Sequence, residues 1–388
     1  MKPPKILDVD VSLVDNAVTY WREGGLVVIP TETVYGLGAD ATNGEAVARI
    51  YALKSRPQFN PLIIHVADVR AAIRYVEWND TAELLAEAFW PGPLTLVLKR
   101  RARSRISELV SAGGDTLAVR VPAHPVALKL LQGFNGAIAA PSANRSGRVS
   151  PTTAQHVRDE FGVDAPLIID GGPCEVGLES TVLDISGDVP VLLRAGAITR
   201  AMLEGVLSHQ SSVISHQLPV VGHLHNMGDN GAACAVVPLP LRERLGEGAL
   251  ELYTSPSPPL TQPSPARGEG FDAASVMLAP STQHPVPILK SPGMLASHYA
   301  PSIPVRLNAM EVRGDEALIA FGPTPLAGAA TTLNLSPRGD VIEAAANLFA
   351  HLRVLDDPRH RAIVVMPIPN EGVGEAINDR LSRASVGR

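Results

Sequence analysis

The sequence predicts an α/β fold with one sizeable sheet, followed by a smaller Rossmann-like domain. Short, apolar, β-branched runs bounded by Gly or Pro recur up to about residue 208, and helical patterns stand between some of them. Alternation of strands and helices resumes near the C-terminus. At 388 residues and 45% hydrophobic content, the chain can bury a large core, and its length favours two domains.

The first unit contains eight runs that are typical of strands. They read GLVVIP, NPLIIHV, LTLVLKR, TLAVRVP, GAIAAP, PLIID, STVLDI and VLLRAG. Residues 44–55 predict a helix with Asn43 as its N-cap and Pro57 as a stop. TAELLAEAFW predicts another helix. SPTTAQHVRDEF predicts a third, with Ser150 as N-cap and Pro151 as the first helical residue.

The pattern breaks down between about 209 and 289. Residues 254–270 hold five prolines and two glycines, a composition that predicts a flexible insert. Order is expected again at SPGMLASHYAP, residues 291–301. Strands ALIAFG, TTLNL and AIVVMPIP then alternate with helices DVIEAAANLFAHLRVL and GEAINDRLSRA. We therefore predict a catalytic domain at 1–208, a linker at 209–302 and a small Rossmann-like domain at 303–388.

Charge and cysteine content exclude some function classes. The net charge of -6 argues against a chain-wide attraction to nucleic acid or to anionic membranes. Cys174 and Cys234 have no metal-ligand spacing, so neither a disulfide framework nor a structural zinc site is indicated. Without an apolar leader or a stretch of ~20 uncharged residues, the protein is expected to be soluble and cytoplasmic.

The stretch IPTETVYGLGAD begins as an apolar strand and turns polar within one step. Thr31 and Thr33 offer hydroxyls, while Gly36 and Gly38 would let the backbone approach a bound group closely. It is neither a Walker A loop nor a dinucleotide fingerprint. A tight turn without a ligand is an equally good interpretation from the loop alone.

Four cations stand at the ends of predicted helices or in predicted strands. Lys54 and Arg56 end a helix, where the helix dipole favours cations in any case. Arg120 and Arg194 lie in short, apolar strands and need an anion. Together they could converge on a polyphosphate, which we favour over separate salt bridges.

The remaining polar positions are less specific. The loop AAPSANRSG can offer donors to phosphate but is also an ordinary turn. His65 is more often a core histidine than a ligand, and Ser180 could simply begin a strand. The sequence shows neither a nucleophile triad nor a cluster of metal ligands.

Together these motifs resemble the Sua5-type threonylcarbamoyl-AMP synthases of the YrdC/Sua5 family. The resemblance covers about residues 10–205 and 290–388. It implies a YrdC-like open twisted sheet with a basic cavity, then a linker, then a Rossmann-like Sua5 domain. The strings that carry it are PTETVYGLGAD, ALKSRPQFNPLIIHV, FWPGPLTLVLK, LAVRVPAHP, APSANRSGRVSPTTA, DGGPCEVGLESTVLD, LLRAGAIT and SPGMLASHYAP.

The resemblance also implies an activity. Such an enzyme joins L-threonine, bicarbonate or CO2, and ATP into threonylcarbamoyl-AMP and releases pyrophosphate. The product serves the t6A modification of tRNA through downstream transferase proteins. Mg2+ would be held mainly by the phosphates of ATP, with no metal ligands from the protein.

Site residues follow from the matching motif positions. The resemblance implies catalytic roles for Lys54, Arg56 and Arg120. It implies threonine contacts at Thr33, His65, Arg120, Ala140 and Ser180. It implies ATP contacts at Lys54, Arg56, Asn60, Thr116, Ser142, Asn144, Ser150, Arg194 and Tyr299, with His298 and Tyr299 closing over the cavity.

Two departures and two alternatives remain open. The segment 209–289 is far longer than the usual link, and the linker string GMLASHY lacks a lysine that some members carry. The cavity could instead bind double-stranded RNA or tRNA, or serve another YrdC-type adenylating or carbamoyl-transfer enzyme. Pyrophosphate release that depends on threonine and bicarbonate would discriminate among them.

Overall fold

The computed structural model describes residues 6–7, 11–208 and 298–386. All of them belong to one compact unit, Met1–Leu224 with Pro287–Arg388. The predicted insert and most of the predicted linker lie outside the described residues, so the domain limits at 208 and 302 stay predictions. Within the described ranges, no helix has the length and apolar content that a membrane crossing requires.

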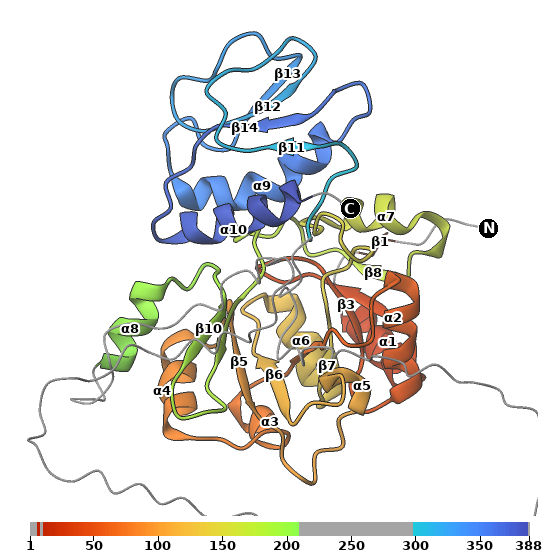
Figure 1. Cartoon of the computed structure of the whole chain (residues 1–388). Coiled ribbons are helices and arrows are strands. Elements are labelled where there is room, and N and C mark those ends of the chain that lie inside the picture. Colours follow the sequence, from red (N-terminus) through yellow and green to blue (C-terminus); the bar gives the residue numbers. More distant parts are fainter. Residues whose placement is uncertain (1–5, 8–10, 209–297, 387–388) are drawn as a thin grey trace, which may run out of the picture. The chain divides into compact units, whose positions relative to one another are not determined.

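Ten strands form one mixed sheet in the order β1-β8-β2-β3-β7-β4-β6-β5-β9-β10 (Figure 1). All eight runs expected as strands are strands, which confirms that part of the prediction. The bounds are β1 (Ile6–Leu7), β2 (Val27–Ile29), β3 (Gly36–Asp40), β4 (Ile63–His65), β5 (Leu94–Lys99), β6 (Thr116–Arg120), β7 (Ile138–Ala139), β8 (Leu167–Ile169), β9 (Thr181–Asp184) and β10 (Val191–Arg194).

The helices of this first part connect and cover the strands. Their bounds are α1 (Val11–Arg22), α2 (Gly44–Lys54), α3 (Val69–Ile73), α4 (Asp80–Phe89), α5 (Glu108–Ser111), α6 (Pro125–Phe134), α7 (Ala154–Phe161) and α8 (Arg200–Ser208), with a short 3-10 turn at Gly162–Asp164. Helix α2 begins as predicted, because the Asn43 side chain accepts from the backbone N–H groups of Glu45 and Ala46.

The predicted start of α7 is wrong. Its N-cap is Thr153, whose hydroxyl accepts from the His156 N–H at 3.2 Å. The hydroxyl of Ser150 instead donates to the Glu179 carboxylate at 2.5 Å. A distant acid therefore takes the hydroxyl that the local sequence offered to the helix, and the helix begins after two further polar residues.

Strand β3 was not predicted, because its residues read as a glycine-rich turn. It pairs antiparallel with β2, and the Trp21 indole N–H donates to the Gly38 carbonyl at 3.0 Å. A Cβ at Gly38 would lie 3.1 Å from the Trp21 ring and 3.0 Å from Ile138. The close approach that requires this glycine is therefore to the core, not to a ligand.

The two faces of the sheet are covered differently, and this difference places the site. Val28, Leu37, Ile64 and Val119 face a large core that also holds residues of α2, α4, α7 and α8. On the opposite face, α1 and α6 pack over β2, β7 and β8. The rest of that face carries only a small cluster made by strand residues, namely Ile63, Val97, Ala118, Val182 and Leu193. Alternation along β4 and β6 puts His65 and Arg120 on this less covered side.

The C-terminal part is a small α/β domain with a four-stranded, all-parallel sheet in the order β11-β14-β12-β13 (Figure 1). This confirms the predicted smaller domain. Both helices pack on one face of the sheet, whereas the other face is covered by loop residues such as Ala309 and Met366. The elements are β11 (Val305–Arg306), β12 (Ala317–Ala320), β13 (Thr331–Asn334), α9 (Val341–Leu355), β14 (Ile363–Val365) and α10 (Val373–Ser385).

Candidate active site

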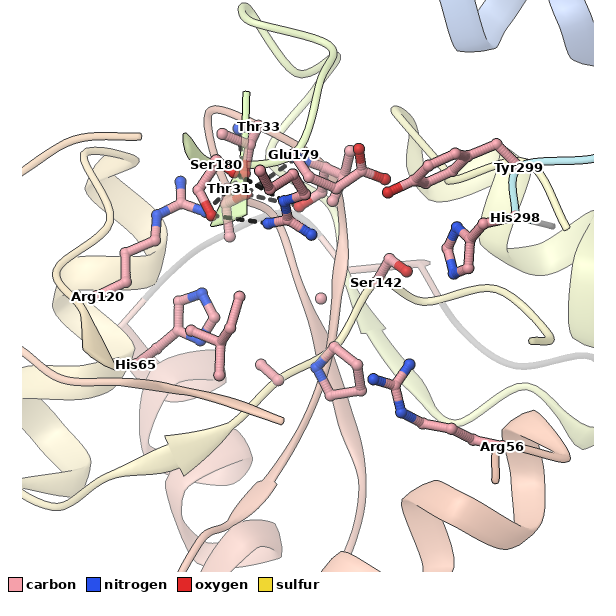
Figure 2. Close-up of a pocket in the computed structure, with 16 residues that line it drawn as sticks. Thr31, Thr33, Arg56, His65, Arg120, Ser142, Glu179, Ser180, His298 and Tyr299 are labelled. Carbon is pink, nitrogen blue, oxygen red and sulfur yellow. Dashed lines mark hydrogen bonds between the residues drawn. The ribbon is translucent and has the colours of Figure 1, made fainter. Parts of the chain in front are cut away.

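A pocket of about 530 Å³, partly open to solvent, lies on the less covered face of the large sheet (Figure 2). Arg120 and His65 reach it from one side, and Arg56, His298 and Tyr299 from the other. The pocket is lined by Thr31, Thr33, Val34, Gly36, Arg56, Ile63, His65, Arg120, Ala140, Pro141, Ser142, Glu179, Ser180, Arg194, His298 and Tyr299.

Arg120 ends strand β6 and is almost fully buried. Its guanidinium donates to the Glu32 carboxylate at 2.6 Å, to the Thr33 hydroxyl at 2.8 Å and to the Gly92 carbonyl at 3.1 Å. The sequence prediction found this arginine but missed Glu32, although an acid between two threonines after a buried strand was a visible signal. The charge of Arg120 is therefore compensated within the protein.

The polar turn after β2 is held by Thr31. Its hydroxyl donates to the Val34 carbonyl at 2.6 Å and accepts from the N–H groups of Thr33 and Val34. The two threonine hydroxyls lie 2.8 Å apart. The turn thus presents Thr33 to the pocket in a fixed orientation, beside Arg120.

His65 ends strand β4 and lies opposite Arg120 in the parallel register of β4 and β6. Burial, and then the charge of Arg120, lower the pKa of His65 to about 3. Its Nδ1 has no hydrogen-bond partner among the described residues. The pocket therefore contains a neutral imidazole with an unused ring nitrogen.

Arg56 follows α2 through Ser55, which adopts a left-handed conformation with φ 51°. Its guanidinium donates to the carbonyls of Asn60 at 3.1 Å and Pro61 at 2.8 Å. Burial is the main cause that lowers the pKa of Arg56 to about 10, and the charge of Arg194 adds to the effect. Within the described ranges, Arg56 forms no ion pair with a carboxylate.

Arg194 ends strand β10 and is also buried. It donates to the Ser180 carbonyl and to the Ser180 hydroxyl, both at 3.0 Å. That hydroxyl also lies 2.7 Å from the Thr95 hydroxyl. Burial lowers the pKa of Arg194, and no carboxylate of the described chain forms an ion pair with it.

Lys54 lies next to the pocket but does not line it. Its ammonium donates to the carbonyls of Ser142 and Asn144, and it is almost fully buried. Burial, and then the charge of Arg56, lower the pKa of Lys54 well below its usual value. Lys54 thus fixes the loop that brings Ser142 to the pocket.

The predicted site residues divide into those that line the pocket and those that do not. Thr33, Arg56, His65, Arg120, Ala140, Ser142, Ser180, Arg194 and Tyr299 line the pocket, and so does His298. Lys54, Asn60, Thr116, Asn144 and Ser150 do not. Of this second group, Asn60 and Asn144 each have buried side-chain atoms without partners. The Asn144 side chain donates to the carbonyls of Arg145 and Arg148, whereas Thr116 faces Lys99 across the β5–β6 pair.

The pair His298–Tyr299 enters the pocket from the start of the described range 298–386. The two rings meet edge to face with centroids 4.0 Å apart, and Tyr299 stacks on Phe349 of α9 at 5.5 Å. Tyr299 has φ 62°, which is unusual for a residue other than glycine. Sequence analysis missed Glu179, which lines the pocket beside Tyr299 (Figure 2).

A metal held by protein side chains alone finds no support in this pocket. Among residues 11–208 and 298–386, no group of three or more His, Cys, Asp or Glu side chains is placed to hold a metal ion. Glu179 is the single carboxylate among the lining residues. The geometry instead suits a ligand that carries several negative charges next to small polar groups.

Sequence comparison relates both parts of the chain to known families. A sequence model of the Sua5/yciO/yrdC family, described as "Telomere recombination", matches residues 19–196. A second, described as "Threonylcarbamoyl-AMP synthase, C-terminal domain", matches residues 272–386.

Similar proteins cover nearly the whole chain. The threonylcarbamoyl-AMP synthase of Pyrococcus abyssi is 34% identical over 95% of this chain and 93% of its own length. That of Bacillus subtilis is also 34% identical, over 96% and 93%. The crystal structure of P. abyssi Sua5 complexed with L-threonine matches with a TM-score of 0.74 and 32% identity, and covers 98% of each chain.

Proposed function

Because the chain belongs to the Sua5-type threonylcarbamoyl-AMP synthases, we propose that its pocket binds L-threonine beside Arg120 and the phosphates of ATP between Arg56 and Arg194. Family membership makes the protein an enzyme with ATP as a substrate. The reaction joins L-threonine, bicarbonate or CO2, and ATP, and yields threonylcarbamoyl-AMP and pyrophosphate. What we propose is the placement of threonine at one end of the pocket and of the ATP phosphates at the other.

One observation carries this placement. Three buried arginines from β6, β10 and the turn after α2 line a single pocket, although they are far apart in sequence. Among the residues that the structure describes, two of them have only neutral hydrogen-bond partners. Buried positive charge without a counterion is costly unless a ligand supplies the anion. A polyphosphate supplies several.

The Arg120 end suits an α-amino acid. The guanidinium already binds Glu32 and Thr33, so a substrate carboxylate would approach a donor set that is fixed in advance. The hydroxyls of Thr33 and Ser180 and the small Ala140 leave polar, compact surroundings for a hydroxy amino acid. The related P. abyssi structure was solved with L-threonine, which supports this assignment.

The chemistry needs proximity more than a nucleophile from the protein. The threonine amine, once neutral, adds to CO2 with loss of a proton, or to bicarbonate with loss of water. An oxygen of the resulting carbamate then attacks the α-phosphorus of ATP, with pyrophosphate as the leaving group. The carbamate decomposes in water, so a pocket that holds both reactants favours capture over loss. Arg56 and Arg194 offset negative charge that builds on the phosphates.

Mg2+ fits the pocket as a companion of ATP. The single lining carboxylate, Glu179, accepts from Ser150 and Arg380, so the phosphate oxygens would supply most of the ligands. When bound, the ion would withdraw charge from the phosphates. The protein residues would then orient the nucleotide rather than coordinate the metal.

Transfer to tRNA forms a further part of the proposal. The product is a reactive mixed anhydride of a carbamate and AMP, so a transferase must take it up before hydrolysis. Downstream t6A transferase proteins have the chemistry to do so. The net charge of -6 fits an indirect link to tRNA better than direct binding by this chain.

The test is an incubation of the full chain with ATP, bicarbonate and each amino acid in turn. We expect pyrophosphate release that requires both threonine and bicarbonate. Release with another acceptor would instead assign a different YrdC-type adenylating enzyme, and no release with tight RNA binding would assign a nucleic-acid module. Arg359→Gln is a suitable control variant, because Arg359 is exposed and its ion pair in the described part of the chain is with the nearby Asp357.

A further inference from the structure

Arg380 on α10 carries a charge although its side chain has no contact with solvent. Its side chain is 0% exposed, and it is among the largest fully buried side chains of the described residues. It belongs to the C-terminal domain, whereas the three arginines that line the pocket come from the first part of the chain. A buried charge at this position requires partners that offset its desolvation.

Its partners lead to the pocket. The Nε of Arg380 donates to Oε2 of Glu179 at 3.1 Å, and its Nη1 donates to Asp379 at 2.8 Å. Its guanidinium carbon lies 5.6 Å from the centroid of the Tyr299 ring. Glu179 and Tyr299 both line the pocket, but Arg380 does not.

Glu179 is the residue through which Arg380 can affect the substrate. It is buried, and its second oxygen accepts from the Ser150 hydroxyl at 2.5 Å. The Ser150 carbonyl in turn accepts from Arg353 of α9 at 3.4 Å. Both carboxylate oxygens are therefore held, one by the C-terminal domain directly and one by a residue that the same domain contacts.

We propose that Arg380 is a positioning residue for the synthase reaction: it neutralises the single carboxylate that faces the pocket and fixes Glu179 and Tyr299 for ATP binding. This inference rests on the proposed function. It gives the C-terminal domain a defined part in the active site, because one of its side chains completes the electrostatics of a pocket built by the other domain.

The physical reason lies in the charges around Ser180. Glu179 directly precedes Ser180, to which Arg194 donates twice. If Arg380 is absent, the released carboxylate can turn toward Arg194 and compete with phosphate for it. The same loss also leaves a negative charge in the pocket, which repels a polyanion in surroundings of low dielectric constant.

Loss of Arg380 should also weaken ATP binding through Tyr299. Its ring contacts Phe349 on one side and the guanidinium of Arg380, and it holds an unfavourable backbone conformation. Contacts that fix such a residue have to outweigh the strain of its positive φ. Without Arg380, Tyr299 loses one of these contacts. The part of the pocket wall that Tyr299 forms beside the proposed phosphate site is then less well fixed.

The test is a double-substitution cycle that measures the affinity for a non-hydrolysable ATP analogue and the KM for ATP. We expect Arg380→Met to weaken analogue binding by roughly tenfold or more. In the Glu179→Gln background the same change should weaken it by no more than about threefold, because no carboxylate remains to be neutralised. Arg380→Lys should recover part of the affinity.

Glu375→Gln is the matched control. Glu375 lies on the same helix and pairs with Arg200 of α8 at 3.1 Å, so it removes another contact between the two domains away from the pocket. It should leave the KM for ATP unchanged. Equal losses for Arg380→Met and Glu375→Gln, or a loss that is as large in the Glu179→Gln background, would show that Arg380 only docks the domains and would overturn the proposal.

The readouts also separate this inference from the proposed function. If the wild-type chain releases no pyrophosphate with threonine, the synthase assignment fails. If it does, and Arg380→Met keeps wild-type affinity for the analogue while remaining folded by circular dichroism, the positioning role fails alone. If the Arg380→Met protein does not fold, Arg380→Lys decides: weaker analogue binding than in the wild type supports the positioning role, and unchanged binding overturns it.

Discussion

The two ends of the pocket carry the same kind of residue in opposite electrostatic states. At one end, Arg120 is paired with the Glu32 carboxylate at 2.6 Å. At the other, the partners that the described residues give to Arg56 and Arg194 are carbonyls and a hydroxyl. All three are buried, so the difference does not come from exposure to solvent.

This contrast indicates which substrate group belongs at which end. A compensated arginine can orient a group of charge -1 without needing it for stability. Two uncompensated arginines raise the electrostatic potential of their end, and a ligand with several negative charges relieves it. The polyphosphate therefore belongs with Arg56 and Arg194, and the amino acid with Arg120.

The largest effect is expected at the compensated end. Arg120→Gln leaves the buried Glu32 carboxylate without its cation, so the free energy of unfolding should fall by about 3–5 kcal/mol. Threonine-dependent pyrophosphate release should fall as well. Urea denaturation and the KM for threonine measure the two effects separately.

A double variant checks the cause of that loss. Arg120→Gln with Glu32→Gln removes both charges, and we expect most of the stability to return while the KM for threonine stays high. If Arg56→Gln alone destabilises the protein as much as Arg120→Gln, the two ends do not differ in compensation and the contrast fails.

The second effect concerns catalysis at the uncompensated end. Arg56→Gln and Arg194→Gln should each lower kcat/KM for ATP by about 10²–10³-fold, because donors to the phosphates are lost. Their thermal midpoints should stay level or rise, since a buried charge without a counterion has been removed. Steady-state kinetics and thermal scans would show this separation, with Arg359→Gln as the surface control.

Sequence reasoning found the cations of the site because an arginine inside an apolar strand is a strong local signal. Arg120 and Arg194 broke the pattern of β6 and β10, and both line the pocket. The shared face of His65 and Arg120 became visible only in the register of β4 and β6. Local sequence periodicity was therefore enough to predict the main part of the fold and the positively charged residues of the site.

The negative half could not be found in the same way. Glu32 and Glu179 lie in segments without regular periodicity, and their partners are 88 and 201 residues away in sequence. Arg380 reads as one of several charged residues on an amphipathic helix, and only its burial distinguishes it. Charge pairing across long sequence distances leaves no local pattern, so residues that compensate a site are harder to predict than residues that attract a ligand.

For Lys54, the sequence motif and the structure suggest different roles. Its motif suggested a phosphate contact, whereas its ammonium donates to two backbone carbonyls under the Ser142 loop. A lysine can serve either purpose with the same sequence spacing. Its assignment as an ATP contact stays a prediction, and the structure offers a positioning role as the alternative.

A third prediction sharpens the contrast through pH. The pKa of His65 is lowered from 6.5 to about 3, so the unfolded state binds a proton first as pH falls and stability declines between these values. At pH 5 this amounts to about 2 kcal/mol. His65→Gln should therefore lose about 2 kcal/mol less than the wild type between pH 7.5 and 5 in urea denaturation. An unchanged pH dependence would mean that folding does not lower the pKa of His65.

The smallest effect on activity separates the two glycines of β3, because Gly36 lines the pocket and Gly38 does not. At Gly38 an added Cβ would meet the Val27 carbonyl and Ile138 at 3.0 Å, so Gly38→Ala should destabilise the fold by about 1–3 kcal/mol with little change in KM. At Gly36 the nearest atom is the Ala140 Cβ at 3.3 Å, and Gly36 lines the pocket. Gly36→Ala should therefore cost less stability than Gly38→Ala and raise the KM for substrate a few-fold. If both variants lose only stability, β3 serves the core alone and Gly36 does not face a bound substrate.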